Sequence, residues 1–198
     1  MKRLVLAVAV LVAHAANGAL PDVKDGDIIF HTSRSSQSVA IQRATGSRYS
    51  HMGIIFLRGG QPAVFEAVST VRYTPLEQWV ARGQGGHFVV KRLASPLTAD
   101  QVRRLTEAAR EYEGRRYDLT FEWSDTRMYC SELVWKLFQR AIGVRIGALQ
   151  HLREFNLSDP VVQAKMKERY GNDVPLQEPV ISPSAMFSSP LLVTVAER

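Results

Sequence analysis

Residues 127 to 138 have the sequence RMYCSELVWKLF and contain Cys130, the only cysteine among 198 residues. Apolar side chains recur at positions 133, 134, 137, 138, 141 and 142, which is the spacing of a helix that buries one side. Gly143 follows directly and is a suitable stop signal. Counting back one turn places Cys130 on the same side, so we expect its thiol at the helix N-terminus, pointing inward. There the free N–H groups and the helix dipole favour a thiolate.

The first residues differ in composition from the rest of the chain, which has 45% hydrophobic and 22% charged residues overall. Lys2 and Arg3 precede an apolar run over residues 4 to 13, and small residues follow up to Ala19. This pattern predicts a secretory signal peptide over residues 1–19 and a single domain over residues 20–198. A short basic start is typical of bacterial export, so we expect a periplasmic protein.

Export changes how Cys130 is interpreted, because cysteines in an oxidising compartment usually pair and this one has no partner within the chain. A reactive thiol becomes a stronger hypothesis. An intermolecular disulfide, or a small buried cysteine that only fills space, remains open at this point.

The formal net charge of +6 falls to +4 when Lys2 and Arg3 are removed with the signal peptide. The chain has no recognisable basic arm or nucleic-acid motif, which argues against binding to nucleic acid. For an exported protein this charge favours peripheral contact with an anionic envelope, or a basic surface with no specific partner. Composition says nothing about the oligomeric state.

A β-hairpin is predicted where two apolar runs, residues 50–57 and 62–68, flank Gly59-Gly60. With a two-residue loop, Gly53 faces Glu66, so His51 and Glu66 share one face as diagonal neighbours within side-chain reach. Gly53 leaves room between them. A carboxylate that accepts a hydrogen bond from one imidazole nitrogen leaves the other nitrogen to take a proton from a thiol. Taken singly, His51 could be a core histidine and Glu66 could face solvent.

Further elements follow from local signals, and these are taken in chain order. We expect a strand over residues 28–31, a helix from residue 33 or 35 to 44, and a short helix opened by a capping box at residues 74–77. After these we expect a strand over residues 87–93, helices opened by residues 98–101 and 158–160, and a strand over residues 191–195.

A zinc site is the alternative explanation for the cysteine and the histidines. Structural zinc sites show close pairwise ligand spacing, which is lacking among Cys130, His31, His51 and His87. Glycine-rich phosphate loops of the nucleotide-binding kinds are also missing from the sequence. We therefore expect neither a metal nor a cofactor.

Three runs together resemble the YiiX-type branch of the permuted NlpC/P60 superfamily, papain-like cysteine hydrolases. They are DGDIIF at residues 25–30, YSHMGI at 49–54 and YCSEL at 129–133. The likeness spans about residues 25 to 142, with a weaker echo at residues 181–183. His51 precedes Cys130, the order that marks the circularly permuted branch. The resemblance implies an α+β, circularly permuted papain-like fold, with an antiparallel sheet or open barrel packed against the Cys-bearing helix.

The same resemblance implies roles for three residues, with Cys130 as the nucleophile, His51 as the base and Glu66 as the third member of a Cys-His-Glu triad. The backbone N–H of Cys130 would hold part of the oxyanion. The expected reaction is hydrolysis of an amide bond through an acyl-thioester. The substrate would be a small peptide, a peptidoglycan stem peptide or other cell-wall fragment, or an amino-acid amide.

The substrate pocket is expected to include Tyr129, Ser50 and Gly53, although Tyr129 could equally serve packing alone. Two alternatives to an amidase remain, because fold does not choose the chemistry. One is an acyltransferase or esterase that acts on a lipid. The other is an envelope binding module that retains the pocket without activity.

Overall fold

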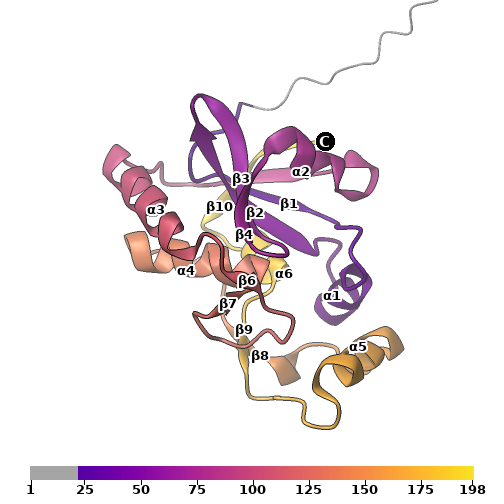
Figure 1. The fold of residues 1–198 in the computed structure, drawn as a ribbon. Helices are drawn as coiled ribbons and strands as arrows, with labels where there is room; N and C mark the ends of the chain where they lie inside the picture. Colours follow the sequence, from indigo (N-terminus) through magenta and orange to yellow (C-terminus); the bar gives the residue numbers. More distant parts are fainter. Residues whose placement is uncertain (1–21) are drawn as a thin grey trace, which may run out of the picture.

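The computed structural model describes residues 22–198, whose arrangement Figure 1 shows. The predicted signal peptide therefore lies outside the described residues. In chain order the strands are β1 (Ile28–His31), β2 (His51–Arg58), β3 (Gln61–Ala67), β4 (Val71–Pro75), β5 (Val89–Leu93), β6 (Arg116–Tyr117), β7 (Arg127–Met128), β8 (Gln150–His151), β9 (Pro179–Val180) and β10 (Leu192–Glu197). The helices are α1 (Ser38–Thr45), α2 (Leu76–Ala81), α3 (Ala99–Tyr112), α4 (Cys130–Ile142), α5 (Pro160–Tyr170) and α6 (Pro183–Phe187), with 3-10 turns η1 (Gln84–Gly86) and η2 (Leu152–Glu154).

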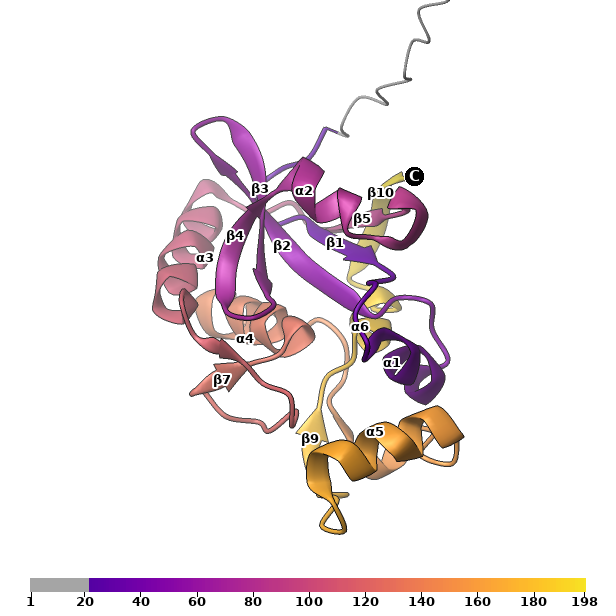
Figure 2. The ribbon, with the colours of Figure 1, turned by 45° about the vertical axis from the view of Figure 1, so that its right-hand side comes forward.

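The main sheet has six strands in the order β10-β5-β1-β2-β3-β4, and every neighbouring pair is antiparallel. Helix α4 packs on one face of this sheet against β2 and β3, and α3 packs beside α4. The short helix α2 lies on the opposite face, as Figure 2 shows. The expected α+β class, with an antiparallel sheet packed against the Cys-bearing helix, is confirmed.

Strand β2 is buried on both faces, which explains its nearly continuous apolar sequence. Successive side chains of a strand point to opposite sides, so Ile54 joins the core under α4 while Ile55 joins the core under α2. Phe138 of α4 and Trp79 of α2 are fully buried in these two cores. His51 of β2 and Glu66 of β3 thus lie on a sheet that is covered on both faces, and Cys130 lies on a helix packed against that sheet.

The hairpin has the predicted register, with Arg58 opposite Gln61 and Ile54 opposite Phe65. Gly59 and Gly60 form the turn with φ of 59° and 79°, a left-handed conformation that glycine adopts without strain. The register places residues 51 and 66 as diagonal neighbours, as expected.

The motif at residues 25–30 anchors the sheet and does not face the candidate site. Asp27 is buried and accepts two hydrogen bonds from Arg92 of β5, from Nε at 2.6 Å and Nη2 at 2.8 Å. Asp25 accepts a hydrogen bond from the N–H of Leu57 at 2.7 Å. The run therefore joins the start of β1 to two other strands.

Several predicted helix boundaries are confirmed. Gly143 ends α4 in the left-handed conformation, and its N–H donates to the carbonyl of Gln139 at 3.0 Å. The capping box at Thr98 opens α3. Asp159 caps α5, which ends at Gly171.

Two predicted boundaries are wrong, for tertiary reasons. Thr74 does not cap α2: it lies in β4, and its hydroxyl donates to Glu66 at 2.6 Å instead. Helix α1 begins at Ser38, later than predicted, because the N–H of Ser33 donates to the hydroxyl of Ser50 at 2.9 Å and Ser33 forms a β-bridge with Gly83. Thr74 and Ser33, which suggested helix starts, thus bind partners from other segments.

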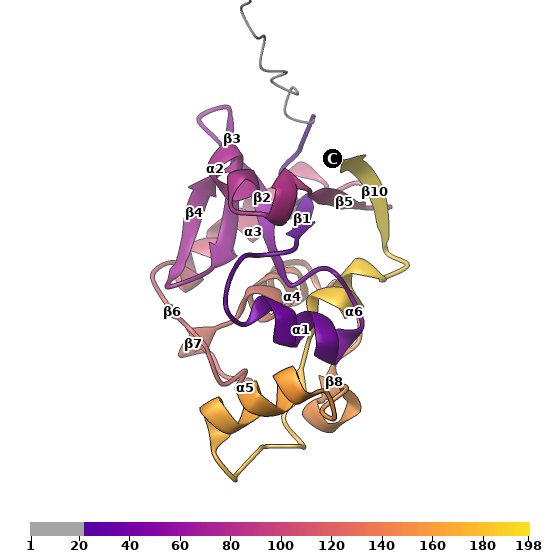
Figure 3. The same ribbon diagram turned by 90° about the vertical axis from the view of Figure 1, so that its right-hand side faces the viewer.

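Helix α5 lies beyond α1 on the side away from the main sheet, as Figure 3 shows. Arg169 of α5 donates to the amide oxygen of Gln37, just before α1. Helix α1 is thereby held between the sheet and α5. None of the described helices is both long enough and apolar enough to cross a bilayer.

Candidate active site

Helix α4 presents Cys130 as its first residue, as expected, and only 3% of the residue is exposed. A segment near the C-terminus holds the helix start in place. The hydroxyl of Ser131 donates to the carbonyl of Ile181 at 2.7 Å, and the N–H of Ile181 donates to the hydroxyl of Tyr129 at 3.2 Å. These two bonds give a structural role to residues 181–183, whose sequence also resembles the family. They hold the two residues that flank Cys130.

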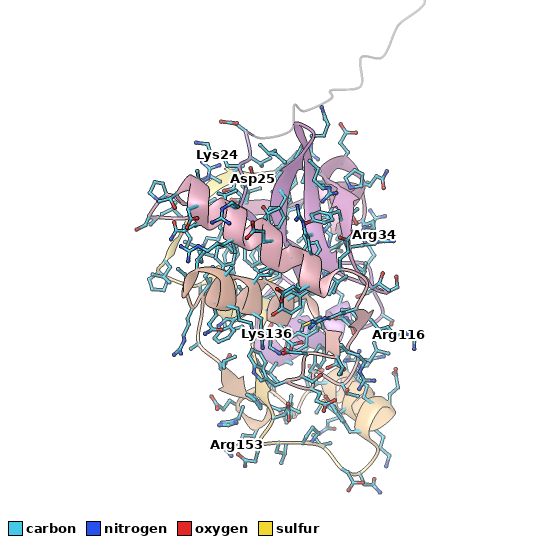
Figure 4. The ribbon with its side chains drawn as sticks, turned by 60° about the vertical axis from the view of Figure 1, so that its left-hand side comes forward. Lys24, Asp25, Arg34, Arg116, Lys136 and Arg153 are labelled. Atoms are coloured by element: carbon cyan, nitrogen blue, oxygen red, sulfur yellow. The ribbon has the colours of Figure 1, made fainter. Side chains whose placement is uncertain are left out.

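A buried polar network fixes the helix from its other side. Lys136 donates to Glu132 at 2.7 Å, to the carbonyl of Ser124 at 2.6 Å and to Asp125 at 2.9 Å. Figure 4 labels Lys136 beside α4. Burial raises the pKa of Glu132 to about 7 even though Lys136 opposes this shift. The network ties the irregular segment before Cys130 to the helix.

The hairpin brings His51 and Glu66 together as the register predicted. His51 Nε2 and Glu66 Oε2 are 2.7 Å apart, with His51 8% exposed and Glu66 fully buried. The other carboxylate oxygen accepts hydrogen bonds from Thr74, at 2.6 Å, and from Arg82. Burial alone would raise the pKa of Glu66, but the hydrogen bond and charge of His51, with Thr74 and Arg82, outweigh it and lower the pKa to about 2. Glu66 is therefore a carboxylate.

The thiol of Cys130 lies near the imidazole of His51 and contributes to raising its pKa. Because Nε2 is engaged by Glu66, Nδ1 is the nitrogen left for the thiol. Burial alone would lower the pKa of His51, but the hydrogen bonds and charges of Cys130 and Glu66 raise it to about 9. His51 therefore carries a proton at neutral pH, with a carboxylate on one side and the sulfur on the other.

His31 supports this imidazole from the neighbouring strand, where it is the register partner of His51. Its ring stacks on Trp79 with centroids 3.8 Å apart and lies 5.3 Å from the ring of His51. Burial, and then the charge of His51, lower the pKa of His31 to about 2, so it stays neutral. Gly83 closes over it, since a Cβ there would lie 2.9 Å from His31 Nδ1.

Tyr117 and Gln37 are site residues that sequence reasoning missed. Gln37 donates to the Tyr117 hydroxyl at 2.7 Å, so this hydroxyl keeps its own proton free for another acceptor. Burial and then the nearby Cys130 raise the pKa of Tyr117, which keeps the phenol protonated. The two residues are 80 positions apart in sequence, and Tyr117 ends the two-residue strand β6, so no local pattern could have found the pair.

Two cavities flank the candidate catalytic residues. Cys130 and Tyr129 line a narrow, almost wholly apolar cavity that extends between α1 and α5. His51 and Ser50 line a larger cavity, which has more polar surface than the first and is called the polar cavity. Two of the three predicted pocket residues thus lie at cavities, on opposite sides of the site.

Gly53, the third predicted pocket residue, lies inside the sheet and lines neither cavity. A Cβ at this position would lie 2.4 Å from Val64 Cγ1, 2.8 Å from the carbonyl oxygen of Phe65 and 3.3 Å from Glu66 Cβ. Close approach of β2 to β3 therefore explains this glycine, and the approach keeps Glu66 within reach of His51.

Known proteins resemble this chain along nearly its whole length. Residues 22–196 match the family described as permuted papain-like amidase enzyme, YaeF/YiiX, C92 family. The chain is 51% identical to the uncharacterized protein YiiX of Escherichia coli K12 over 198 residues, which are all of this chain and 97% of that protein. The crystal structure of metalloprotein yiiX from Escherichia coli O157:H7 matches with a TM-score of 0.87 and 54% identity, over 88% of this chain and 97% of the other.

Because that relative is described as a metalloprotein, the side chains here must be tested for a metal site. In the part of the chain from residue 22 onward, no group of three or more His, Cys, Asp or Glu side chains could hold a metal ion. His51 is engaged by Glu66 and Cys130, and His31 packs on Trp79. The side chains of residues 22–198 therefore do not fit a metal centre.

Proposed function

The chain belongs to the C92 family of permuted papain-like amidases, and from this membership we propose that it hydrolyses an amide bond through an acyl-thioester on Cys130. Membership confirms the resemblance inferred from the three sequence runs, and with the structural match it confirms the permuted papain-like fold. The observation that carries the proposal is the hydrogen bond between Glu66 and His51, together with the nearby Cys130 thiol, which helps to raise the pKa of His51.

In the proposed reaction the Cys130 proton resides on His51, and the sulfur attacks the carbonyl carbon of the amide. The carbonyl oxygen becomes an oxyanion, and its donors are the backbone N–H of Cys130, free at the helix start, and the hydroxyl of Tyr117. His51 then gives its proton to the amide nitrogen, the C–N bond breaks, and the amine leaves. Water attacks the thioester with His51 as base, which releases the carboxylic acid and restores the thiol.

The proposed substrate is a small peptide, a cell-wall stem peptide or an amino-acid amide.

The proposal includes export to the periplasm, removal of residues 1–19 and peripheral contact with the anionic envelope. Cell fractionation tests the export. We expect a chain shortened at its N-terminus in the periplasmic extract, whereas a full-length chain in the cytoplasm would contradict it.

An acyltransferase or esterase that acts on a lipid is the second candidate. It is favoured by the apolar cavity beside Cys130, whose surface suits a hydrocarbon chain. The acyl-thioester would be the same, and only the leaving group and the final acceptor would differ.

The test compares wild type with Cys130→Ala on peptidoglycan fragments, aminoacyl amides and phospholipids, with products identified by mass spectrometry. We expect wild type alone to release amine and acid in equal amounts from an amide. Thermal unfolding of Cys130→Ala serves as the folding control. Equal turnover by both proteins would rule out the nucleophile, and Cys130-dependent release of fatty acid from phospholipid would establish the second candidate.

A further inference from the structure

The two cavities border different catalytic candidates. The apolar cavity is lined by Cys130 and not by His51, whereas the polar cavity is lined by His51 and not by Cys130. Gln37 lines both, so the two cavities adjoin at this side chain, which donates to the hydroxyl of Tyr117. A substrate bound across this site would place one part of its structure in each cavity.

The chemistry proposed above decides which part of the substrate occupies each cavity. The acyl group becomes bonded to the sulfur of Cys130, so it lies on the sulfur side. The amine receives its proton from His51, so it lies on the imidazole side. The acyl group therefore occupies the apolar cavity, and the leaving amine occupies the polar one.

The apolar cavity suits a hydrocarbon acyl chain. Its walls come from α1, α5 and the segment around Ile181, including Ile41, Ala44 and Met166. Two cations also line it, and both already have hydrogen-bond partners: Lys165 donates to Glu168 and Arg169 to the amide oxygen of Gln37. The surface that remains is almost entirely apolar, so a polar acyl group would lose hydration there without gaining partners.

The polar cavity suits an anion. Two guanidinium groups line it, those of Arg34 and Arg82, together with the hydroxyl residues Ser33, Ser35, Ser36 and Ser50. No Asp or Glu lines it within the described residues. Arg82 is paired with Glu66, while exposed Arg34 has no hydrogen bond or ion pair to another described residue. Figure 4 shows Arg34 at the surface. With protonated His51 at one wall, the local charge is positive.

We propose that the substrate is an N-acyl amine in which a hydrocarbon acyl group binds the apolar cavity and an amine bearing an anionic group binds the polar cavity. An N-acyl amino acid has this chemistry. Water cleaves its amide into a fatty acid and the free amino acid, with no further reactant. This inference rests on the proposed function and adds to it the class of substrate and its orientation.

Four amides test the orientation, with free acid and amine measured by mass spectrometry for wild type and Cys130→Ala. They are N-decanoylglycine, N-decanoylglycinamide, N-acetylglycine and the reversed amide glycyl decylamide. We expect kcat/KM for N-decanoylglycine to exceed that of each other compound by at least about 10-fold. N-decanoylglycinamide lacks the carboxylate, N-acetylglycine lacks the long hydrocarbon chain, and glycyl decylamide carries its hydrocarbon chain on the amine instead of the acyl group. Preference for glycyl decylamide, or equal rates for all four, would overturn the proposal.

Variants test the two cavities separately. Arg34→Gln should lower the ratio of kcat/KM for N-decanoylglycine over N-decanoylglycinamide by about 5-fold or more, because it removes a cation that only the carboxylate uses. Arg43→Gln is the matched control, since Arg43 is exposed on α1 and lines neither cavity. Ala44→Phe should lower the preference for decanoyl over acetyl by narrowing the apolar cavity. An unchanged ratio in either test variant would remove that cavity from the proposal.

The outcomes separate this inference from the proposed function. Cys130-dependent cleavage of a peptidoglycan fragment or aminoacyl amide without cleavage of N-decanoylglycine would overturn the substrate class and keep the amidase. Absence of Cys130-dependent cleavage of every compound would overturn both.

Discussion

Glu66 is the residue on which the electrostatics of the site depend. It is fully buried, and it accepts hydrogen bonds from a histidine, a threonine and an arginine, which hold it as a carboxylate. Its hydrogen bond and charge help to raise the pKa of His51 to about 9, so His51 is protonated at neutral pH. The triad itself stays a prediction until activity is measured.

Glu66→Gln should move the alkaline limit of activity. In wild type, kcat/KM should fall as pH rises through about 9, because His51 then loses the proton that the leaving amine needs. Glutamine lacks the charge that raises the pKa of His51, so the alkaline limb should shift down by about 1 pH unit or more. Thr74→Val is the matched control: it removes one hydrogen bond to Glu66 but keeps the charge, so its shift should be smaller. An unmoved limb in Glu66→Gln would exclude Glu66 from this role.

Tyr117→Phe should lower kcat by about 100-fold with little change in KM, because an oxyanion donor acts in the transition state. The control is Tyr112→Phe, which changes a buried tyrosine whose hydroxyl accepts a hydrogen bond from Arg140 at 2.8 Å. Steady-state kinetics on one amide substrate provide both values. Equal kcat in the two variants would remove Tyr117 from the mechanism.

At the scale of elements, the close contact of β2 with β3 places His51 beside Glu66. Gly53 allows this contact, and the side chain of Val64 and the backbone of Phe65 occupy the space that a Cβ would need. The hairpin therefore supplies both residues of the pair and the spacing between them.

Gly53→Ala should lower the free energy of unfolding by about 1 to 3 kcal/mol through overpacking. Val64→Ala removes the nearest methyl group, so it should cost less in the Gly53→Ala background than in wild type. Urea unfolding of the two single variants and the double variant gives this coupling. Strictly additive effects on the free energy of unfolding would show that contact with Val64 is not the reason why position 53 requires glycine.

At the scale of the whole molecule, the His51–Glu66 pair should make global stability depend on pH at both ends of the range. The pKa of Glu66 is lowered from 4.5 to about 2, so its contribution is present above about pH 4.5 and is lost as pH falls toward 2. The pKa of His51 is raised from 6.5 to about 9, so its contribution is present below about pH 6.5 and is lost as pH rises through 9.

Each arm of this profile should amount to about 3 kcal/mol, and the two arms describe the same pair, so they do not add. Chemical denaturation at a series of pH values measures the profile. Glu66→Gln should lose the acid arm, and Cys130→Ala should reduce the alkaline arm because Cys130 contributes to the raised pKa of His51. Profiles of identical shape for wild type and Glu66→Gln would contradict the assignment.

What the sequence by itself determined is the part of the molecule that depends on short-range patterns of residues. The helical spacing after Cys130, the stop at Gly143 and the Gly59-Gly60 turn each depend on a few neighbouring residues, so α4 and the register of the hairpin were predictable. The facing of His51 and Glu66 followed from that register alone. The run at residues 25–30 indicated the family from its sequence, whereas its role in anchoring strands is seen only in the structure.

Only the tertiary structure decided which partners complete the site. Thr74 carries a helix-capping pattern, yet its hydroxyl donates to Glu66, because a buried carboxylate competes for it across the sheet. Gln37 and Tyr117, and the walls of the two cavities, come from segments far apart in sequence. Such contacts depend on how the elements pack, and hydrophobic burial, which drives that packing, is non-directional and leaves no short-range pattern in the chain.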